Sequence, residues 1–263
     1  MGDEELLHGG VANAGAVLRS GSTVLRPSNE HSRSILAFLS RLEAGGFKGA
    51  PSPVGIEPDG RERLRFIPGE VATPPYPRWA QSDEALASVV TLIRELHVAS
   101  ERTDTSDLTW SSEMADPSGG AVICHNDVCL ENVVFQDGRA VALLDFDFAA
   151  PGRRTFDLAA FARMCVPVDD EINAARLGWE PADRPSRLRI VCDTYGLDAG
   201  DRSELLESLS DAIAAGGEFV RRRAEAGEPG FVQMWNEMGG MERFDRRRRW
   251  WAERKPEFEA ALR

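Results

Sequence analysis

Two short polar segments, each directly after an apolar stretch, carry the residues best suited to chemistry. The first is His-Asn-Asp-Val-Cys-Leu-Glu-Asn at 125–132, and the second is Asp-Phe-Asp at 145–147. A carboxylate can accept the proton of an attacking hydroxyl, and amide and carboxylate oxygens suit Mg²⁺ bound to phosphates. The spacing therefore predicts phosphoryl transfer, with Asp127 as the base and with Asn132 and Asp145 as metal ligands.

Apolar strands must hold these segments at a cleft. Residues 121–124 and 140–144 are apolar and end where the polar segments begin, and a further short apolar stretch lies at 133–135. Upstream, a helix is predicted over 34–43, because its apolar residues fall on one face and Gly45-Gly46 ends it.

The remaining pattern divides the chain into two parts. Residues 6–26 contain glycines and short β-type stretches, with a hairpin turn predicted at Gly21. Residues 51–67 indicate a second hairpin, which turns at Asp59-Gly60. A proline-rich run predicts a hinge between Phe66 and Arg78. Helices are expected from Ser82 onward and at about 155–165, 169–177, 183–195, 201–225 and 229–262. We therefore predict an α+β fold, with a β-rich nucleotide-binding lobe at 1–70 and a helical lobe at 71–263 that carries the catalytic loop and the acceptor site.

The polar segments also resemble those of a known family. The pattern His-x-Asp-x-x-x-x-Asn, followed by Asp-x-Asp, Gly152-Arg153 and Asp157-Leu158-Ala159, is similar to the aminoglycoside phosphotransferase and choline kinase superfamily. Its specific part runs from about Ile123 to Ala160. The resemblance implies a two-lobed protein-kinase-like fold, with a small antiparallel sheet and one helix ahead of a larger, mainly helical lobe.

This resemblance assigns the base and the metal ligands as the spacing does, and it adds supporting residues. His125 would be structural and would hold the loop by hydrogen bonds. Asp157 would brace the catalytic loop from the following helix. Two roles stay open for Asp147, which could assist the metal or substrate or could bond backbone amides.

The N-terminal lobe matches the family less closely. Gly9-Gly10 through Asn13 would form the loop over the phosphates, since backbone N–H groups can cradle anions. Arg26 stands where kinases usually place a lysine on the third strand, and arginine keeps the charge and binds phosphate in a fork. Apolar residues fall near the place of the helix glutamate that usually pairs with this lysine, so the ion pair is either missing or rebuilt.

The hinge would complete the nucleotide site. By the resemblance, the backbone at Phe66 and Ile67 would hydrogen-bond the base of the nucleotide, although a strand end with a turn explains the same residues. The expected cofactors are Mg²⁺ and a phosphoryl donor, ATP or GTP. The sequence does not decide between the two nucleotides.

The acceptor is less well defined. Asp169, Asp170 and Glu171 follow the brace helix, where this superfamily commonly binds its acceptor. These acids could receive an amine-bearing substrate, or could be first-turn acids favoured by the helix dipole. Aminoglycosides, other antibiotics, amino alcohols and sugars all remain open. The arginine run at 246–249 is expected to be a solvated helix face, because acidic residues neighbour it.

Composition limits the partners and the location. The 263 residues carry a net charge of −12, which opposes general nucleic-acid binding and mildly favours cationic substrates. The four cysteines form no Cys-x-x-Cys pair, so a structural zinc site is not expected. Residues 1–7 lack the features of a signal peptide, and no apolar run approaches the roughly 20 residues of a bilayer span, so we expect a cytoplasmic protein.

A second class of function competes with the small-molecule kinase. A non-catalytic nucleotide- or ligand-binding protein with a kinase-like fold would explain Arg26 in the place of lysine and the missing glutamate. The presence of Asp127, Asn132 and Asp145 together opposes it, since a binding module does not need all three. A metal-dependent phosphoesterase is less favoured, because such sites gather several histidine ligands and the chain has four histidines in all.

Overall fold

Short strands with glycine turns form an antiparallel sheet near the N-terminus. In the computed structural model, which describes residues 4–7 and 15–263, five strands pair in the order β1-β2-β3-β5-β4. They are β1 (Glu4–Leu6), β2 (Leu18–Ser20), β3 (Thr23–Arg26), β4 (Pro53–Ile56) and β5 (Glu62–Arg65). Gly21 (φ 61°) turns β2 into β3 and Gly60 (φ 89°) turns β4 into β5, conformations that glycine adopts without steric cost. Both hairpin turns predicted from the sequence are thus confirmed.

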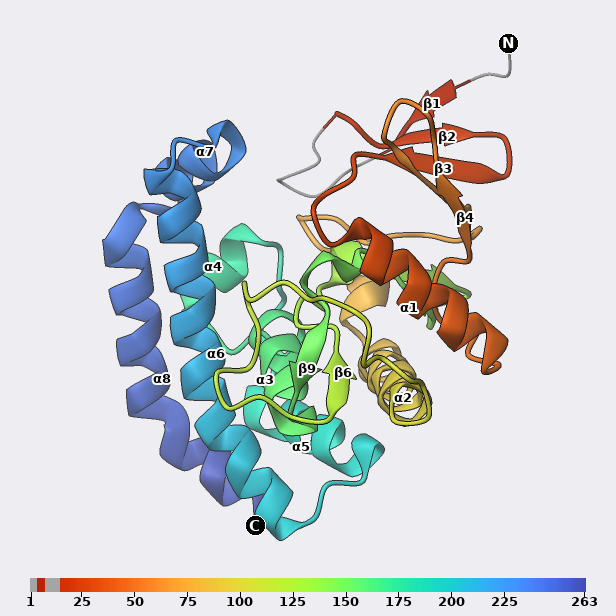
Figure 1. The fold of residues 1–263 in the computed structure, drawn as a ribbon. Helices are drawn as coiled ribbons and strands as arrows, with labels where there is room; N and C mark the ends of the chain where they lie inside the picture. Colours follow the sequence, from red (N-terminus) through yellow and green to blue (C-terminus); the bar gives the residue numbers. More distant parts are fainter. Residues whose placement is uncertain (1–3, 8–14) are drawn as a thin grey trace.

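One helix packs beside this sheet. Helix α1 (Ser32–Ala44) spans the predicted 34–43 and buries the apolar face expected from its periodicity (Figure 1). Phe38 and Leu42 on that face are almost completely buried. The sheet and α1 together form a small lobe that lies at the upper right in Figure 1.

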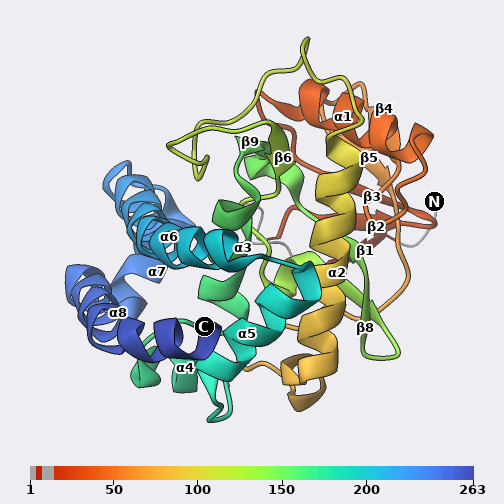
Figure 2. The ribbon, with the colours of Figure 1, turned by 90° about the horizontal axis from the view of Figure 1, so that it is seen from below.

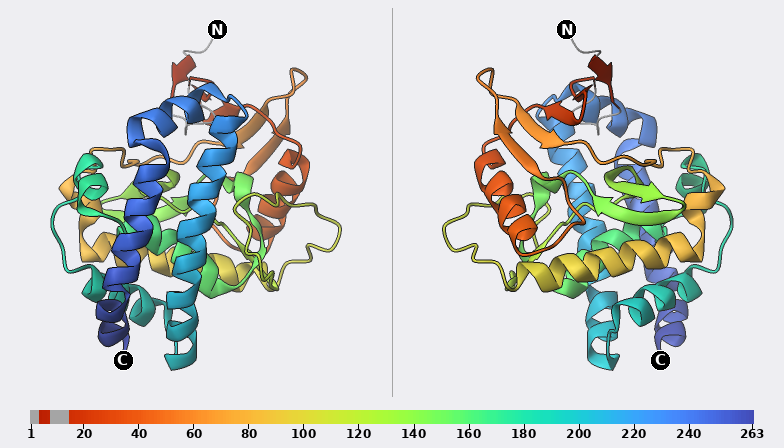
Figure 3. Two further views of the ribbon diagram at one scale, coloured as in Figure 1. Left: turned by 90° about the vertical axis from the view of Figure 1, so that its left-hand side faces the viewer. Right: turned by 90° about the vertical axis from the view of Figure 1, so that its right-hand side faces the viewer.

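Residues 66–77 connect this lobe to the rest of the chain in extended and turn conformations. Glu70 and Phe135 exchange two backbone hydrogen bonds of 2.8 Å, which fasten the connection to the hairpin of β7 (Val133–Gln136) and β8 (Arg139–Leu143). The 3₁₀ helix η2 (Arg78–Gln81) and helix α2 (Asp83–Ser100) follow, and Figure 3 shows the hairpin lying along α2.

The polar segments leave short strands at the centre of the molecule. Strand β6 (Val122–Cys124) pairs antiparallel with β9 (Ala150–Gly152) and leads into the first segment. The 3₁₀ helix η3 (Leu130–Asn132) closes that segment, and η4 (Phe146–Phe148) follows Asp145. The positions of β6, β7 and β8 agree with the predicted apolar strands.

The remaining chain is helical. The helices are α3 (Arg154–Cys165), α4 (Glu171–Arg176), α5 (Arg184–Tyr195), α6 (Ala199–Glu225), α7 (Pro229–Met238) and α8 (Gly240–Leu262). A continuous helix over 229–262 was wrong, because Gly239 adopts φ 84° and divides it. Helices α6 and α8 lie side by side in Figures 1 and 2. Among the described residues, none of these helices combines the length and apolar character of a membrane span. The predicted α+β arrangement of a small sheet lobe and a larger helical lobe is confirmed.

Candidate active site

A buried carboxylate fixes the backbone of the first polar segment. Asp157, in the first turn of α3, accepts hydrogen bonds from the backbone N–H groups of His125 (3.0 Å) and Asn126 (2.7 Å). It also accepts one from His97 Nε2 (2.8 Å), whose Nδ1 lies 2.7 Å from the Tyr195 hydroxyl. Although burial opposes it, these bonds hold the pKa of Asp157 below its usual value. The geometry supports the bracing role predicted for Asp157 and extends it to His97 and Tyr195, which sequence analysis missed.

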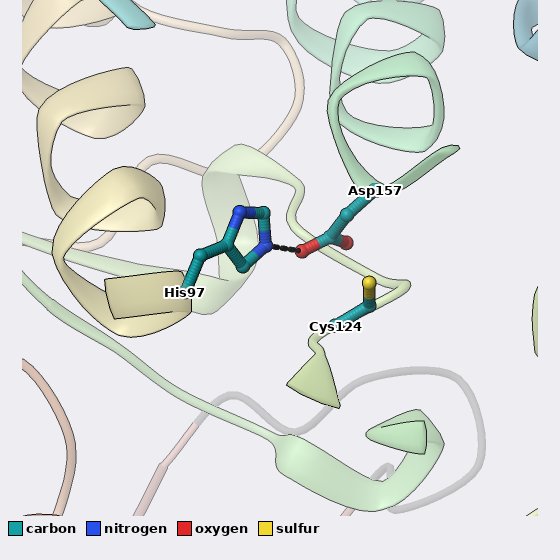
Figure 4. Close-up of side chains that lie close together, drawn as sticks. All are labelled: His97, Cys124 and Asp157. Carbon is teal, nitrogen blue, oxygen red and sulfur yellow. Dashed lines mark hydrogen bonds and ion pairs between the residues drawn. The ribbon is translucent and has the colours of Figure 1, made fainter. Parts of the chain in front are cut away.

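The same buried place could be mistaken for a metal site. His97, Cys124 and Asp157 each have a potential ligand atom within 4.8 Å of those of the other two. Figure 4 shows the three side chains lying close together. However, the Asp157 carboxylate already accepts hydrogen bonds from His97 and from two backbone N–H groups. Burial raises the pKa of the Cys124 thiol well above its usual value, so the thiolate that binds metals is disfavoured. We interpret the three residues as a structural brace.

His125 ties the two polar segments together. Its ring is fully buried, and Nε2 donates to the carbonyl of Leu144 at 2.8 Å, while Nδ1 accepts from the backbone N–H of Asp127 at 3.3 Å. Burial lowers the pKa of His125, which favours this neutral tautomer. These contacts are those expected of a structural histidine.

Asp127 and Asn132 meet at the end of this segment. Asn132 Nδ2 donates to the backbone oxygen of Asp127 at 2.9 Å and to its carboxylate Oδ2 at 3.2 Å. Burial raises the pKa of Asp127 to about 7, and the negative charge of Asp145 adds to this effect, while Arg163 opposes it. A carboxyl group with a pKa near neutrality is well matched to accepting a proton from a hydroxyl.

Three carboxylates surround the side chain of Arg26 on β3. Its Nη1 lies 3.0 Å from Asp145 Oδ1, its Nη2 pairs with Asp147, and its Nε lies 3.3 Å from Glu62 Oε2. Although burial opposes it, the three carboxylates raise the pKa of Arg26. Burial and the neighbouring Asp145 raise the pKa of Asp147 to about 6. Arg26 therefore neutralises an acidic cluster in this structure.

The ion pair of the small lobe is rebuilt on the sheet. Glu62, which is 2% exposed, lies directly opposite Arg26 in the register of β3 and β5. It takes the place of the helix glutamate that the family resemblance led us to seek on α1. Sequence analysis missed Glu62, although its position near the start of a predicted hairpin strand was the available signal.

The predicted nucleotide-binding residues that the structure describes share one cavity. A cavity of about 490 Å³ between the lobes is lined by Arg26, Phe66 and Ile67 on the sheet side and by Asn132 and Asp145 on the helical side. Leu7 and Val17, which flank the predicted phosphate loop, line it as well, whereas Gly9, Gly10 and Asn13 lie outside the described residues. A larger cavity of about 830 Å³ lies between α1 and α2 and is lined by none of the predicted site residues.

The three acids near α4 already have partners. Asp169 lies 2.5 Å from Arg243 Nη2 and 3.0 Å from Arg247 Nη2, and Asp170 lies 3.1 Å from Arg246 Nε. Asp170 also caps α4 by accepting from a backbone N–H of its first turn, as the helix-dipole interpretation anticipated.

Glu171 is exposed, accepts from Trp250 Nε1 at 3.0 Å and lies 3.5 Å from Arg184. The expectation of a solvated face for the run at 246–249 was wrong for Arg247, which is buried against Asp169.

The comparisons with known proteins agree with this geometry. Residues 107–189 match the model of the phosphotransferase enzyme family. The trifolitoxin immunity protein of Rhizobium leguminosarum bv. trifolii is 32% identical over 216 residues, which cover 80% of each chain.

Solved structures with low sequence identity share the fold. A choline/ethanolamine kinase family protein from Mesorhizobium loti is 15% identical, with 95% of this chain and 92% of that chain covered and a TM-score of 0.58. The GDP complex of aminoglycoside 2′-phosphotransferase-IIIa is 12% identical, with 94% and 92% covered and a TM-score of 0.61. The kinase-like fold and the family resemblance predicted from the sequence are thereby confirmed.

Proposed function

Because this chain belongs to the phosphotransferase enzyme family, we propose that it transfers the γ-phosphoryl group of ATP or GTP to a hydroxyl of a small molecule. One observation carries the proposal. Asn132 and Asp145 line the cavity between the lobes beneath Arg26, and Asn132 directly contacts the carboxylate of Asp127. A binding protein would not need a carboxylate of raised pKa beside these two oxygen-bearing side chains.

Within this proposal, each residue has a defined task. Asp127 orients the acceptor hydroxyl and takes its proton. Arg26 holds the phosphates, with Glu62 anchoring its guanidinium from β5. Phe66 and Ile67 border the base, and Gly9, Gly10 and Asn13 cover the phosphates. Residues 1–70 then act as the nucleotide lobe, and residues 71–263 carry the catalytic loop and the acceptor site.

The acidic cluster fits a divalent cation. Asp145 and Asp147 lie close enough together that burial and mutual repulsion raise the pKa of Asp147, so the pair requires a positive partner. We propose that Asn132 and Asp145 hold Mg²⁺, with Asp147 beside them, because amide and carboxylate oxygens are its usual protein ligands. When bound, Mg²⁺ supplies charge neutralisation of the phosphates. Arg26 would then release Asp145 and remain held by Glu62.

The similarity to the trifolitoxin immunity protein suggests a biological setting. The trifolitoxin immunity protein is named for protection against a toxin. Phosphorylation of a hydroxyl adds charge and bulk to a compound and can prevent it from reaching its target. We therefore propose toxic small molecules as the first acceptors to screen.

The test combines nucleotide binding with transfer. Thermal melts of the full chain with ATP or GTP should show a raised midpoint that requires Mg²⁺, since a ligand of the native state stabilises it. Transfer of labelled γ-phosphate should then be lost in Asp127→Ala and in Asp145→Ala, while Asp211→Ala, an exposed acid on α6, serves as the control.

The outcomes separate the kinase from its rival. Full transfer or hydrolysis in both site variants would refute the proposed roles of these residues. A nucleotide-dependent midpoint without turnover on any acceptor would favour the non-catalytic binding protein.

A further inference from the structure

Arg163 on α3 is a buried cation that forms no ion pair within the part of the chain that the structure describes. Arg163 is 8% exposed, and its Nε has no hydrogen-bond acceptor among the described residues. The negative charges of Asp127 and Asp169 act on its guanidinium from beyond ion-pair distance. Removing a charge from water costs several kcal/mol unless it is paired. A buried guanidinium in this state is therefore expected to meet an anion that binds from outside the chain.

Arg163 lies close enough to Asp127 for the charge of each residue to act on the other, and contacts with α6 fix its surroundings. A methyl group added at Gly216 would lie 2.5 Å from Arg163 Nη1, so the guanidinium rests directly against the backbone of α6. One turn further along α6, Phe219 packs against Phe148 with ring centroids 5.2 Å apart. The carbonyl of Phe148 accepts a hydrogen bond of 2.8 Å from Asn126, the residue before the proposed base.

The acids near Arg163 other than Asp127 are paired with other arginines. Asp169 is paired with Arg243 and Arg247, and Asp170 is paired with Arg243 and Arg246. Burial and the nearby charges of Arg163 and Arg243 lower the pKa of Arg247 to about 9, although Asp169 opposes this. The sequence left open whether Asp169, Asp170 and Glu171 bind an amine or are first-turn acids of a helix. In the structure, Asp169 and Asp170 are surrounded by buried arginines.

We propose that the acceptor carries a carboxylate as well as its hydroxyl, and that Arg163 binds this carboxylate while Asp127 faces the hydroxyl. The planar guanidinium can meet a carboxylate with two parallel hydrogen bonds, which fixes the orientation of the acceptor. This inference rests on the proposed function and narrows its substrate class to hydroxy acids, including compounds with a free carboxyl end.

The transfer balances with these groups alone. The hydroxyl oxygen forms a bond to the γ-phosphorus, and the bond from that phosphorus to the β–γ bridging oxygen breaks. The proton of the hydroxyl passes to the Asp127 carboxylate. The nucleoside diphosphate leaves, and the phosphorylated hydroxy acid keeps its carboxylate on Arg163 until it is released.

Matched acceptors test the proposal on the full chain with Mg²⁺ and nucleotide. The probes are glycerate and glycerol, and N-acetylserine and N-acetylserinamide, together with ethanolamine as a cationic acceptor. Thermal midpoints with nucleotide present measure binding, and labelled γ-phosphate measures transfer. We expect the carboxylates to raise the midpoint and to exceed their neutral partners in kcat/KM by about 10-fold or more, the discrimination of one charge-assisted pair.

Variants then assign the effect to Arg163. Arg163→Gln should remove the preference for carboxylate acceptors but keep the midpoint shift with nucleotide. Arg163→Lys should keep part of the preference for carboxylate acceptors. Gly216→Ala offers an independent route, because its methyl group displaces the guanidinium without removing the charge. Arg246→Gln, at a paired and more exposed arginine, is the matched control and should leave the preference unchanged.

Each result decides between distinct outcomes. Equal or better use of neutral or cationic acceptors overturns the inference, as does an intact carboxylate preference in Arg163→Gln. A shifted pH profile without a changed preference would reduce Arg163 to a counter-charge for Asp127 and would also overturn it. If nucleotide raises the thermal midpoint but none of the hydroxy acids does, only the proposed carboxylate-binding role of Arg163 is refuted. If nucleotide itself does not change the midpoint, the proposed function is refuted.

Discussion

Replacing Arg26 with alanine should show how strongly the stability of the acidic cluster around it depends on one cation. The guanidinium touches Glu62, Asp145 and Asp147, whose side chains are 2%, 25% and 18% exposed. Loss of one partner of a buried ion pair costs about 3–5 kcal/mol, because the other charge stays buried and unpaired. Partial exposure of the two aspartates screens their share, so we expect a loss of about 3 kcal/mol for Arg26→Ala.

Thermal melts at neutral pH measure this loss. For a chain of this size about 3 kcal/mol corresponds to a fall in Tm of roughly 6–12 °C. Mg²⁺ should restore more stability to Arg26→Ala than to the unaltered protein, since it can replace the missing positive charge at Asp145. Arg254→Ala, at an exposed pair on α8, should change Tm by about 1 °C or less.

The pH dependence gives the reasoning a second check. Burial already raises the pKa values of Glu62 and Asp147, and the loss of Arg26 should raise them further, so the native state binds protons more tightly than the unfolded chain. The penalty is then absent below the unfolded values near pH 4, grows as the pH rises from these to the folded values, and is complete above the folded values. The difference in Tm should therefore shrink on acidification. An equal deficit at pH 4 and pH 7.5, or a deficit that Mg²⁺ leaves unchanged, would refute the account of Arg26 as the counter-ion of this cluster.

Other single contacts make sharp predictions. Asp127→Asn should stabilise the protein by about 1–3 kcal/mol at pH 8 but not at pH 4, because the raised pKa of Asp127 means that only its ionised form destabilises the folded state. Urea unfolding at both pH values measures the difference. His97→Ala should lower kcat by about 100-fold with little change in the KM for nucleotide, through misplacement of the segment that Asp157 holds; steady-state kinetics test it. Gly239→Ala should cost about 1 kcal/mol in urea unfolding, since φ is 84°, whereas Gly200→Ala, with an ordinary φ, should not.

The polar segment at 125–132 was predictable because its signals are local. An apolar strand, a polar segment and a second apolar strand each occupy a few consecutive residues, and the fold then places Asn132 beside Asp127. The glycines at the turns likewise predicted the hairpins β2–β3 and β4–β5 of the sheet. By contrast, β1 and β9 are three residues long and have too little periodicity to be recognised.

The missed residues depend on contacts between distant parts of the chain. Glu62 meets Arg26 only through the register of β3 and β5, which pairs strands separated by a whole helix. Arg247 sits in a run of arginines and becomes buried because α8 packs against the segment that carries Asp169. Hydrophobic periodicity cannot reveal such a position, since a buried ion pair replaces the apolar contact that the pattern would show.

The charges on the two sides of Asp127 are unbalanced in opposite directions. On the side of the cavity between the lobes, three carboxylates share the single positive charge of Arg26, so a further cation would be favoured there. On the side of α6 and α8, the buried arginines outnumber the acids Asp169 and Asp170, which leaves a demand for negative charge. A divalent cation with its nucleotide would supply the positive charge, and a carboxylate on the acceptor would supply the negative charge. The two ligands would then meet at Asp127, with the cation on the side of the acidic cluster and the acceptor carboxylate on the side of the arginines. A reversed orientation of the acceptor would be disfavoured electrostatically.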